Sequence, residues 1–384
     1  MQQGRGAMAL DEDVLEDGIG LCLSGGGYRA MVFHLGALMR LNEAALLPHI
    51  SRISSVSGGS ITAAYLGLRW NDLRFDERGQ AQALHLVVDK IREMARTSVD
   101  SGAIIGGILL PGSISDRVAA AYDKVLFKGA TLAALPADTV GPRFVVNATN
   151  VQTGALWRFS KPYMGDYRVG LVESPTVPLA IAVAASSAFP PVLSPLTLNI
   201  DASTPWVEGG DLQEPMYRQN VVLSDGGVYD NLGVETLIKR YRTVLVSDAG
   251  QKISAEVNPH HDWARHSIRI LDIVDNQVRS LRKRALIDAY RRGDRSGCYW
   301  GIRSDFSDYA LPSDPLGCVN RDPSSLAAIP TRLQAMPDDE QERLINWGYA
   351  ITDAALRRHF ATDLKTMTGL DIAEPKAFPY PIGY

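Results

Sequence analysis

Short apolar segments alternate with segments of helical periodicity over the first seventy residues. Residues 18–23 are apolar and run into a glycine cluster, which predicts a buried strand. Apolar side chains then recur at helical spacing over residues 28–47, and Pro48 ends this pattern. A second buried strand is predicted over 50–56, followed by a helix over 61–70. Strands that alternate with helices in this way predict a parallel sheet with crossover helices.

The same alternation continues to about residue 250, after which the pattern becomes mainly helical. Further strands are predicted over 143–150, 155–160, 221–224 and 243–248, with helices over 81–96 and 179–187. Beyond residue 250, helices are predicted over 265–292 and 338–360, and the proline-containing tail over 374–384 is expected to be extended. The fold class is therefore α/β with a helical C-terminal part.

Composition narrows the class of protein. The chain has 384 residues, of which 46% are hydrophobic and 21% charged, so it can bury a sizeable core. A net charge of -4 provides no overall attraction to nucleic acid polymers, and we expect no such partner. Residues 1–17 are rich in acidic side chains and are interpreted as a solvated lead-in.

The compartment is suggested by the cysteines and by the lack of targeting signals. Cys22, Cys298 and Cys318 are far apart in the sequence, which supports neither a disulfide framework nor a zinc ribbon. The N-terminus lacks the apolar core of a secretory signal, and the apolar run 103–110 is shorter than the roughly 18–20 residues that span a bilayer. We expect a cytoplasmic protein that is able to associate peripherally with the inner membrane face. No metal-ligand cluster is visible, so no metal and no cofactor are predicted.

The first motif with chemical potential is the glycine loop over residues 24–30. It lies at a strand-to-helix junction, where backbone N–H groups and the helix dipole favour negative charge. Gly25, Gly27 and Ala30 also match the spacing of a dinucleotide-binding loop. The predicted second strand ends in serines rather than in the acidic residue that holds a ribose. A nucleotide-binding module that uses Gly25–Gly27 is kept as an alternative.

Two further motifs follow predicted strands. Ser57, followed by Gly58 and Gly59, fits the sharp turn that exposes a nucleophilic serine, although Ser55 stands where the first glycine of that motif is usual. Taken alone, this segment favours a polar turn whose serines cap a helix. Asp225, followed by two glycines, can project into a crevice or simply form a β-turn, and Asp230 is a nearby competitor.

A serine nucleophile usually requires a histidine base. Of the seven histidines, none lies beside a glycine turn at a predicted strand end, and His34 falls within the first helical pattern, as a core or surface residue would. The sequence therefore favours a base other than histidine, and an aspartate is the best candidate.

Taken together, the segments resemble the patatin-like phospholipase family. That family combines a G-G-G-x-R loop, a G-x-S-x-G turn and a D-G-G/A segment, which correspond here to residues 25–29, 55–59 and 225–227, with a further family-like block over 185–191. The likeness covers about residues 18–250. It implies a three-layer α/β/α core with a mainly parallel central sheet, and no cofactor.

The resemblance also implies acyl-ester hydrolysis by a Ser-Asp dyad. Ser57 would be the nucleophile and Asp225 the base, with backbone N–H groups of Gly25, Gly26, Gly27 and Gly58 in the oxyanion hole. Arg29 would order the glycine loop or bind a substrate phosphate. An aspartate must be partly desolvated for its pKa to approach the working pH.

The resemblance divides the chain into a catalytic domain over 18–250 and a helical extension over 251–384 that packs on it. Residues 101–115 form a candidate flap that either faces lipid or is a buried loop. The expected partners are a phospholipid or other lipid ester and, transiently, a membrane surface. A hydrolase that stays inactive until a ligand or partner opens the flap is a third hypothesis.

Overall fold

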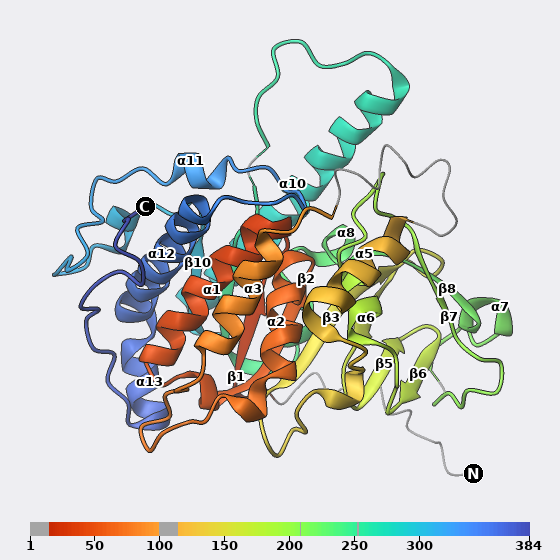
Figure 1. Cartoon of the computed structure of the whole chain (residues 1–384), viewed down its shortest axis with the longest axis horizontal. Helices are drawn as coiled ribbons and strands as arrows, with labels where there is room; N and C mark the ends of the chain where they lie inside the picture. Colours follow the sequence, from red (N-terminus) through yellow and green to blue (C-terminus); the bar gives the residue numbers. More distant parts are fainter. Residues whose placement is uncertain (1–14, 100–113, 208, 252) are drawn as a thin grey trace.

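The computed structural model describes residues 15–99, 114–207, 209–251 and 253–384, and these residues form one ten-stranded sheet with helices on both faces (Figure 1). Most of the predicted lead-in 1–17 and of the flap candidate 101–115 therefore lies outside the described residues. The last two residues of the flap candidate begin the helix α5 (Ile114–Tyr122).

The strands of the main path lie in the order β10 (Ser296–Gly301), β9 (Tyr241–Asp248), β1 (Glu16–Leu23), β2 (Ile50–Val56), β3 (Arg143–Asn150), β4 (Ala155–Phe159), β5 (Tyr163–Asp166) and β6 (Gly170–Glu173). The strands from β10 to β3 run parallel, and those from β4 to β6 are antiparallel. Off this path, β8 (Asn220–Asp225) pairs with β3, and β7 (Leu196–Asn199) pairs with β8, both antiparallel.

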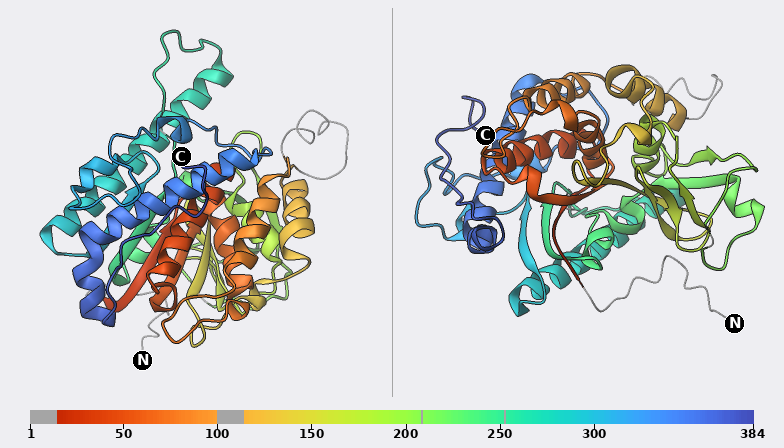
Figure 2. Two further views of the ribbon diagram at one scale, coloured as in Figure 1. Left: turned by 60° about the vertical axis from the view of Figure 1, so that its left-hand side comes forward. Right: turned by 90° about the horizontal axis from the view of Figure 1, so that it is seen from below.

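Helices cover the two faces of the parallel part in separate layers, as the view from below shows (Figure 2). One layer contains α1 (Gly27–Glu43), α2 (Gly58–Leu68), α3 (His85–Ala95) and α12 (Asp338–Ala355). The other layer contains α8 (Gly227–Asp230), α9 (Glu235–Ile238) and α10 (Trp263–Arg292). The remaining helices are α6 (Leu179–Ser186), α7 (Pro215–Arg218), α11 (Ser324–Ala327) and α13 (Ala361–Thr368).

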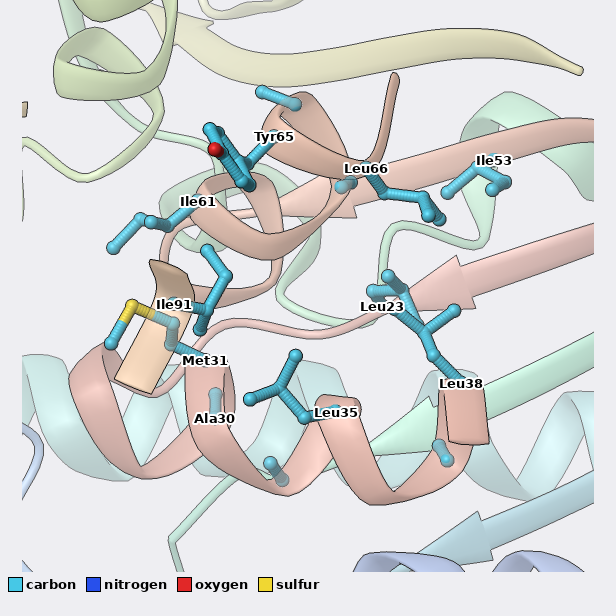
Figure 3. Close-up of a cluster of buried hydrophobic side chains, with 14 of the residues drawn as sticks. Leu23, Ala30, Met31, Leu35, Leu38, Ile53, Ile61, Tyr65, Leu66 and Ile91 are labelled. Atoms are coloured by element: carbon cyan, nitrogen blue, oxygen red, sulfur yellow. The ribbon is translucent and has the colours of Figure 1, made fainter. Parts of the chain in front are cut away.

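Alternation along the strands supplies a core on each face. Leu21 and Leu23 of β1 belong to the larger core, whereas Cys22 between them belongs to the smaller core on the opposite face. Leu23 and Ile53 contact the apolar sides of α1 and α2 in the larger core (Figure 3). A parallel strand that is buried on both faces reads as a continuous apolar run, which explains the sequence pattern.

The mainly parallel core and its crossover helices are confirmed. Four strands were missed. The short strands β5, β6 and β7 belong to the antiparallel part of the sheet, and β10 lies beyond residue 250, where helices had been predicted, and extends the sheet next to β9. Arg279 of α10 is buried. Cys22, Cys298 and Cys318 are all buried and free.

Candidate active site

The site is created where two strands meet end to end along one edge of β3. β2 pairs with β3 as far as Val56, which lies opposite Asn147. β8 approaches from the other direction and ends at Asp225, opposite the next residue, Ala148. The other edge of β3 is occupied by β4. The carboxyl ends of β2 and β8 therefore face each other, and Ser57 follows Val56 directly.

Ser57 sits on a sharp turn. Its backbone has φ 49° and ψ −120°, a conformation that is costly for a residue with a side chain. The turn is tight because a Cβ atom on Gly58 would lie 2.0 Å from the carbonyl oxygen of Gly27. A Cβ atom on Gly59 would lie 2.4 Å from the carbonyl oxygen of Leu23. Only glycine fits after Ser57, and strain of this kind is typical of a nucleophilic serine at a strand-to-helix turn.

A chain of serine hydroxyls holds this turn in place. The Ser57 N–H donates to Ser186 Oγ over 2.9 Å, and the hydroxyls of Ser186 and Ser60 lie 2.9 Å apart. Ser60 Oγ donates to Ser55 Oγ over 3.0 Å, and Ser55 Oγ donates to the carbonyl oxygen of Val145 on β3 over 3.2 Å. Because that carbonyl can only accept, each hydroxyl in the chain donates toward β3.

Ser55 thus has a role that its departure from the family pattern did not suggest. Its side chain ends the hydroxyl chain on β3, instead of leaving the small space of a glycine. Ser186 was quoted only as part of the family-like block 185–191, and its contact with the turn depends on how α6 packs.

Asp225 is almost completely buried beside this turn. Its Oδ1 accepts a hydrogen bond from the Gly227 N–H over 2.7 Å, whereas Oδ2 is buried with no partner among the described residues. Burial raises the pKa of Asp225 to about 7, against the opposing effects of the Gly227 N–H and the Ser57 side chain. Ser57 is therefore close enough to act on the carboxyl, although no fully formed hydrogen bond joins them. Catalytic hydrogen bonds are often long before substrate binds.

Asp230, the competing carboxylate, has a different environment. It is buried, and its oxygens accept hydrogen bonds from the N–H groups of Leu232 and Glu235, with Arg282 nearby. These contacts fix the start of α9, and among the described residues the cavity wall includes Asp225 but not Asp230. Asp225 is the carboxylate that faces Ser57.

The glycine loop leaves some of its amides without an acceptor. The Gly25 N–H donates to the carbonyl oxygen of Asn231 over 3.1 Å, and the Tyr28 N–H donates to that of Arg332 over 3.0 Å. In the part of the chain that the structure describes, the amides of Gly26 and Gly27 find no such partner. Both residues have positive φ, 146° and 59°, and both line the cavity with Ser57. The Gly25 amide is already occupied, so Gly25 is corrected from a donor to a residue that anchors the loop.

Arg29 connects this loop to its surroundings. Its side chain is buried, with Nε donating to the carbonyl oxygen of Ala249 over 3.0 Å and Nη1 to that of Ile329. Burial, followed by repulsion from Arg279, lowers the pKa of Arg29 to about 10. Two backbone contacts of a buried guanidinium favour the loop-ordering role over a purely substrate-binding one.

His34 is a structural residue. It is completely buried, with Nδ1 2.8 Å from Ser247 Oγ and Nε2 3.0 Å from the carbonyl oxygen of Ser24. Burial lowers its pKa to about 4, so the imidazole is neutral. His34 belongs to the core, as one of the two interpretations from the sequence had it.

Ser57 and Asp225 both line a cavity of about 910 Å³, within the range of small-molecule binding sites. Its wall combines the glycine loop with three further segments: residues 187–193, residues 331–334 and the middle of α10. Among the described residues, no group of three or more His, Cys, Asp or Glu side chains could hold a metal ion. No described helix is both long enough and apolar enough to cross a bilayer.

A sequence model described as patatin-like phospholipase matches residues 21–238, which is more than half of the chain. The chain belongs to the patatin-like phospholipase family. The predicted resemblance is thereby confirmed. No curated protein sequence matches this family member.

Among solved structures, the fold is similar to that of human GIVD cytosolic phospholipase A2, with a TM-score of 0.54 and 15% identity. That similarity covers 93% of this chain and 61% of the human protein, so the chain spans less than two thirds of its relative's length. VipD from Legionella pneumophila also matches, with a TM-score of 0.38 and 16% identity over 90% of this chain and 67% of that protein.

Proposed function

We propose that this patatin-like phospholipase family member hydrolyses fatty-acyl esters of lipids through an acyl-enzyme on Ser57, with Asp225 as the base. The observation that carries the proposal is the junction on β3, which brings a strained serine to a buried, partly unpartnered carboxyl. A base with a pKa of about 7 is ionised in a substantial fraction of molecules at neutral pH, and can still return the proton.

The reaction would proceed in two steps. Asp225 accepts the Ser57 hydroxyl proton while Oγ attacks the ester carbonyl carbon. The resulting oxyanion accepts hydrogen bonds from the free amides of Gly26 and Gly27, with the adjacent Gly58 amide as a further donor. The ester C–O bond breaks, and the departing alkoxide takes the proton from Asp225. In the second step Asp225 deprotonates a water, which attacks the acyl carbon. The bond between that carbon and Ser57 Oγ then breaks, and Asp225 returns the proton to Oγ, so that the fatty acid and free Ser57 are released.

The oxyanion contacts would supply much of the rate enhancement. One such donor is typically worth about 3–4 kcal/mol of transition-state stabilisation. The same loop is poorly suited to a nucleotide diphosphate, because the amides of Gly25 and Tyr28 already donate to protein carbonyls. The hydrolase is therefore favoured over the nucleotide-binding alternative. The ligand-switched hydrolase stays a prediction, which full activity of the purified protein without additives would contradict.

A fluorophosphonate probe tests the nucleophile directly. We expect the wild-type protein to be labelled covalently and Ser57→Ala not to be labelled. Ser187→Ala is the matched control and should still be labelled, because Ser187 lines the same cavity and its buried hydroxyl has no partner among the described residues. Labelling retained in a folded Ser57→Ala protein would contradict the assignment.

A further inference from the structure

The first part of α10 stands clear of the rest of the fold in two different views (Figures 1 and 2). It carries large apolar side chains that are exposed to solvent. Trp263 is 84% exposed, Leu271 56% and Val274 53%, and Ile270 is also exposed. Single exposed apolar residues are common, but a group of them on one helix marks an interaction site.

These apolar residues share one side of the helix. At 100° per residue, Trp263, Ile270 and Val274 fall within about 40° of one another, and Leu271 borders them. The opposite side carries charged residues, including Asp272, Asp275 and Arg279, which line the catalytic cavity. The helix is therefore amphipathic, but its orientation is the reverse of the usual one. Its charged side faces the protein and its apolar side faces outward.

The segment 189–192 forms another apolar part of the same cavity mouth. Phe189 and Val192 both line the cavity, and they are still 44% and 41% exposed. Ile268 of α10 lines the cavity as well and is partly exposed. The cavity entrance is thus bordered by three exposed apolar side chains, those of Ile268, Phe189 and Val192.

We propose that the outward apolar side of α10 from Trp263 to Val274, together with the segment 189–192 at the cavity mouth, docks onto the surface of a lipid bilayer. The inference rests on the proposed function, since it states how a lipid ester would reach Ser57. A substrate held in a bilayer must enter through this mouth, and a contact around the mouth leads it from lipid into the cavity without passing through water.

The chemistry of the surface fits the interfacial zone of a bilayer. Tryptophan is enriched there, and amphipathic helices lie with the apolar side buried about 5–10 Å. From Trp263 to Val274 the helix rises about 16 Å, enough to lie along the surface with its apolar side inserted. Arg265 and Arg269 are paired with Asp262 and Glu256, so the contact depends on apolar burial more than on charge. Binding to zwitterionic vesicles with little salt dependence is expected.

Vesicle flotation with phosphatidylcholine liposomes tests the proposal, using Ser57→Ala as the background so that lipid is not consumed. Leu271→Glu combined with Val274→Glu should weaken partitioning at least tenfold. The matched control is Val140→Glu, because Val140 is 59% exposed but precedes β3, at the opposite end of the strands from the dyad. The control should partition as the background protein does. A blue shift of fluorescence on binding, absent in Trp263→Phe, would place the end of α10 in the lipid.

With Ser57 intact, the double variant should hydrolyse a short water-soluble ester within twofold of the wild-type rate, because neither residue lines the cavity. Equal partitioning of the double variant and the Val140 control would overturn the proposal. The proposal would also be overturned if the wild-type protein were a dimer that does not bind vesicles and the double variant were a monomer. That result would show that a second copy of the chain covers this surface. Failure of the proposed function is distinguishable, since it would abolish soluble ester hydrolysis and leave vesicle binding intact.

Discussion

Asp275 on α10 raises the pKa of Asp225, and both residues line the same cavity. The effect adds to that of burial, which is the larger cause. Asp275 is itself perturbed, because burial raises its pKa to about 6, with Arg279 opposing this shift and Asp272 and Asp248 adding to it. Two carboxyls that share a cavity cannot both ionise freely, so the proposed base responds to charge on α10.

Replacement of Asp275 by asparagine is expected to lower the pKa of Asp225. The acid limb of kcat/KM for a water-soluble ester should then move to lower pH, by less than about 1 unit. Asp288→Asn, an exposed change on the same helix, is the control and should leave the profile in place. A profile unchanged by Asp275→Asn, or moved to higher pH, would contradict this coupling.

Asp225→Asn is expected to stabilise the protein while it abolishes ester hydrolysis. The pKa of the carboxyl is about 7 in the folded protein and near 3.8 ordinarily, so the folded state binds the proton more tightly. Stability therefore falls as pH rises from about 4 to about 7, and the full penalty is present above pH 7. Asparagine removes the buried charge and should raise the free energy of unfolding at pH 8 by up to about 4 kcal/mol.

Chemical denaturation at pH 8 and at pH 4 checks this prediction. At pH 4 the carboxyl is protonated in the folded protein, so the gain from asparagine should largely disappear. A variant that is less stable than the wild type at pH 8 would show that the buried carboxylate is compensated by contacts we have not identified.

Gly58→Ala should abolish ester hydrolysis, because its Cβ would collide with the Gly27 carbonyl and displace the glycine loop. We expect kcat to fall by at least about 100-fold, the effect of losing one oxyanion donor. Gly129→Ala is a useful comparison. That glycine has φ 80° and open space around it, so alanine there adds backbone strain without a collision. Normal activity in Gly58→Ala would show that the glycine loop does not take part in catalysis.

Ser186→Ala interrupts the hydroxyl chain and leaves the Ser57 N–H without its acceptor. Leaving a buried donor unpaired costs about 1–3 kcal/mol, which should appear as lower stability and lower kcat. The neighbouring Ser187→Ala is the control, since the Ser187 hydroxyl is buried with no partner among the described residues and its removal should be neutral or stabilising. Equal effects of the two changes, measured by thermal unfolding and ester hydrolysis, would show that the chain does not position Ser57.

The central part of the fold is predictable because each parallel strand is buried on both faces and reads as an apolar run. β1 and β9 contain such runs, and β1, β2 and β9 each end in a polar or glycine-containing turn. β10 was missed because its sequence contains glycines and is too short to show a period. Ser57 and Asp225 could be proposed from their positions after strands. The hydroxyl chain could not, because it depends on the packing of α6 against α2.

The occupied amide of Gly25 and the outward apolar side of α10 were also beyond prediction. Both depend on which partner a segment finds in three dimensions. The apolar periodicity of α10 is that of an ordinary buried helix, and only the structure shows that the apolar side faces away from the protein.

The meeting of β2 and β8 on β3 has a consequence for how the family can diverge. Since consecutive residues of β3, Asn147 and Ala148, fix where the two strands end, the separation of Ser57 and Asp225 is set by one peptide step of a third strand. The separation does not depend on the length of the chain between Ser57 and Asp225. Surface loops between β3 and β8 are therefore free to lengthen, shorten or exchange during evolution and so reshape the cavity, whereas a single inserted or deleted residue within β3 would move Ser57 away from Asp225.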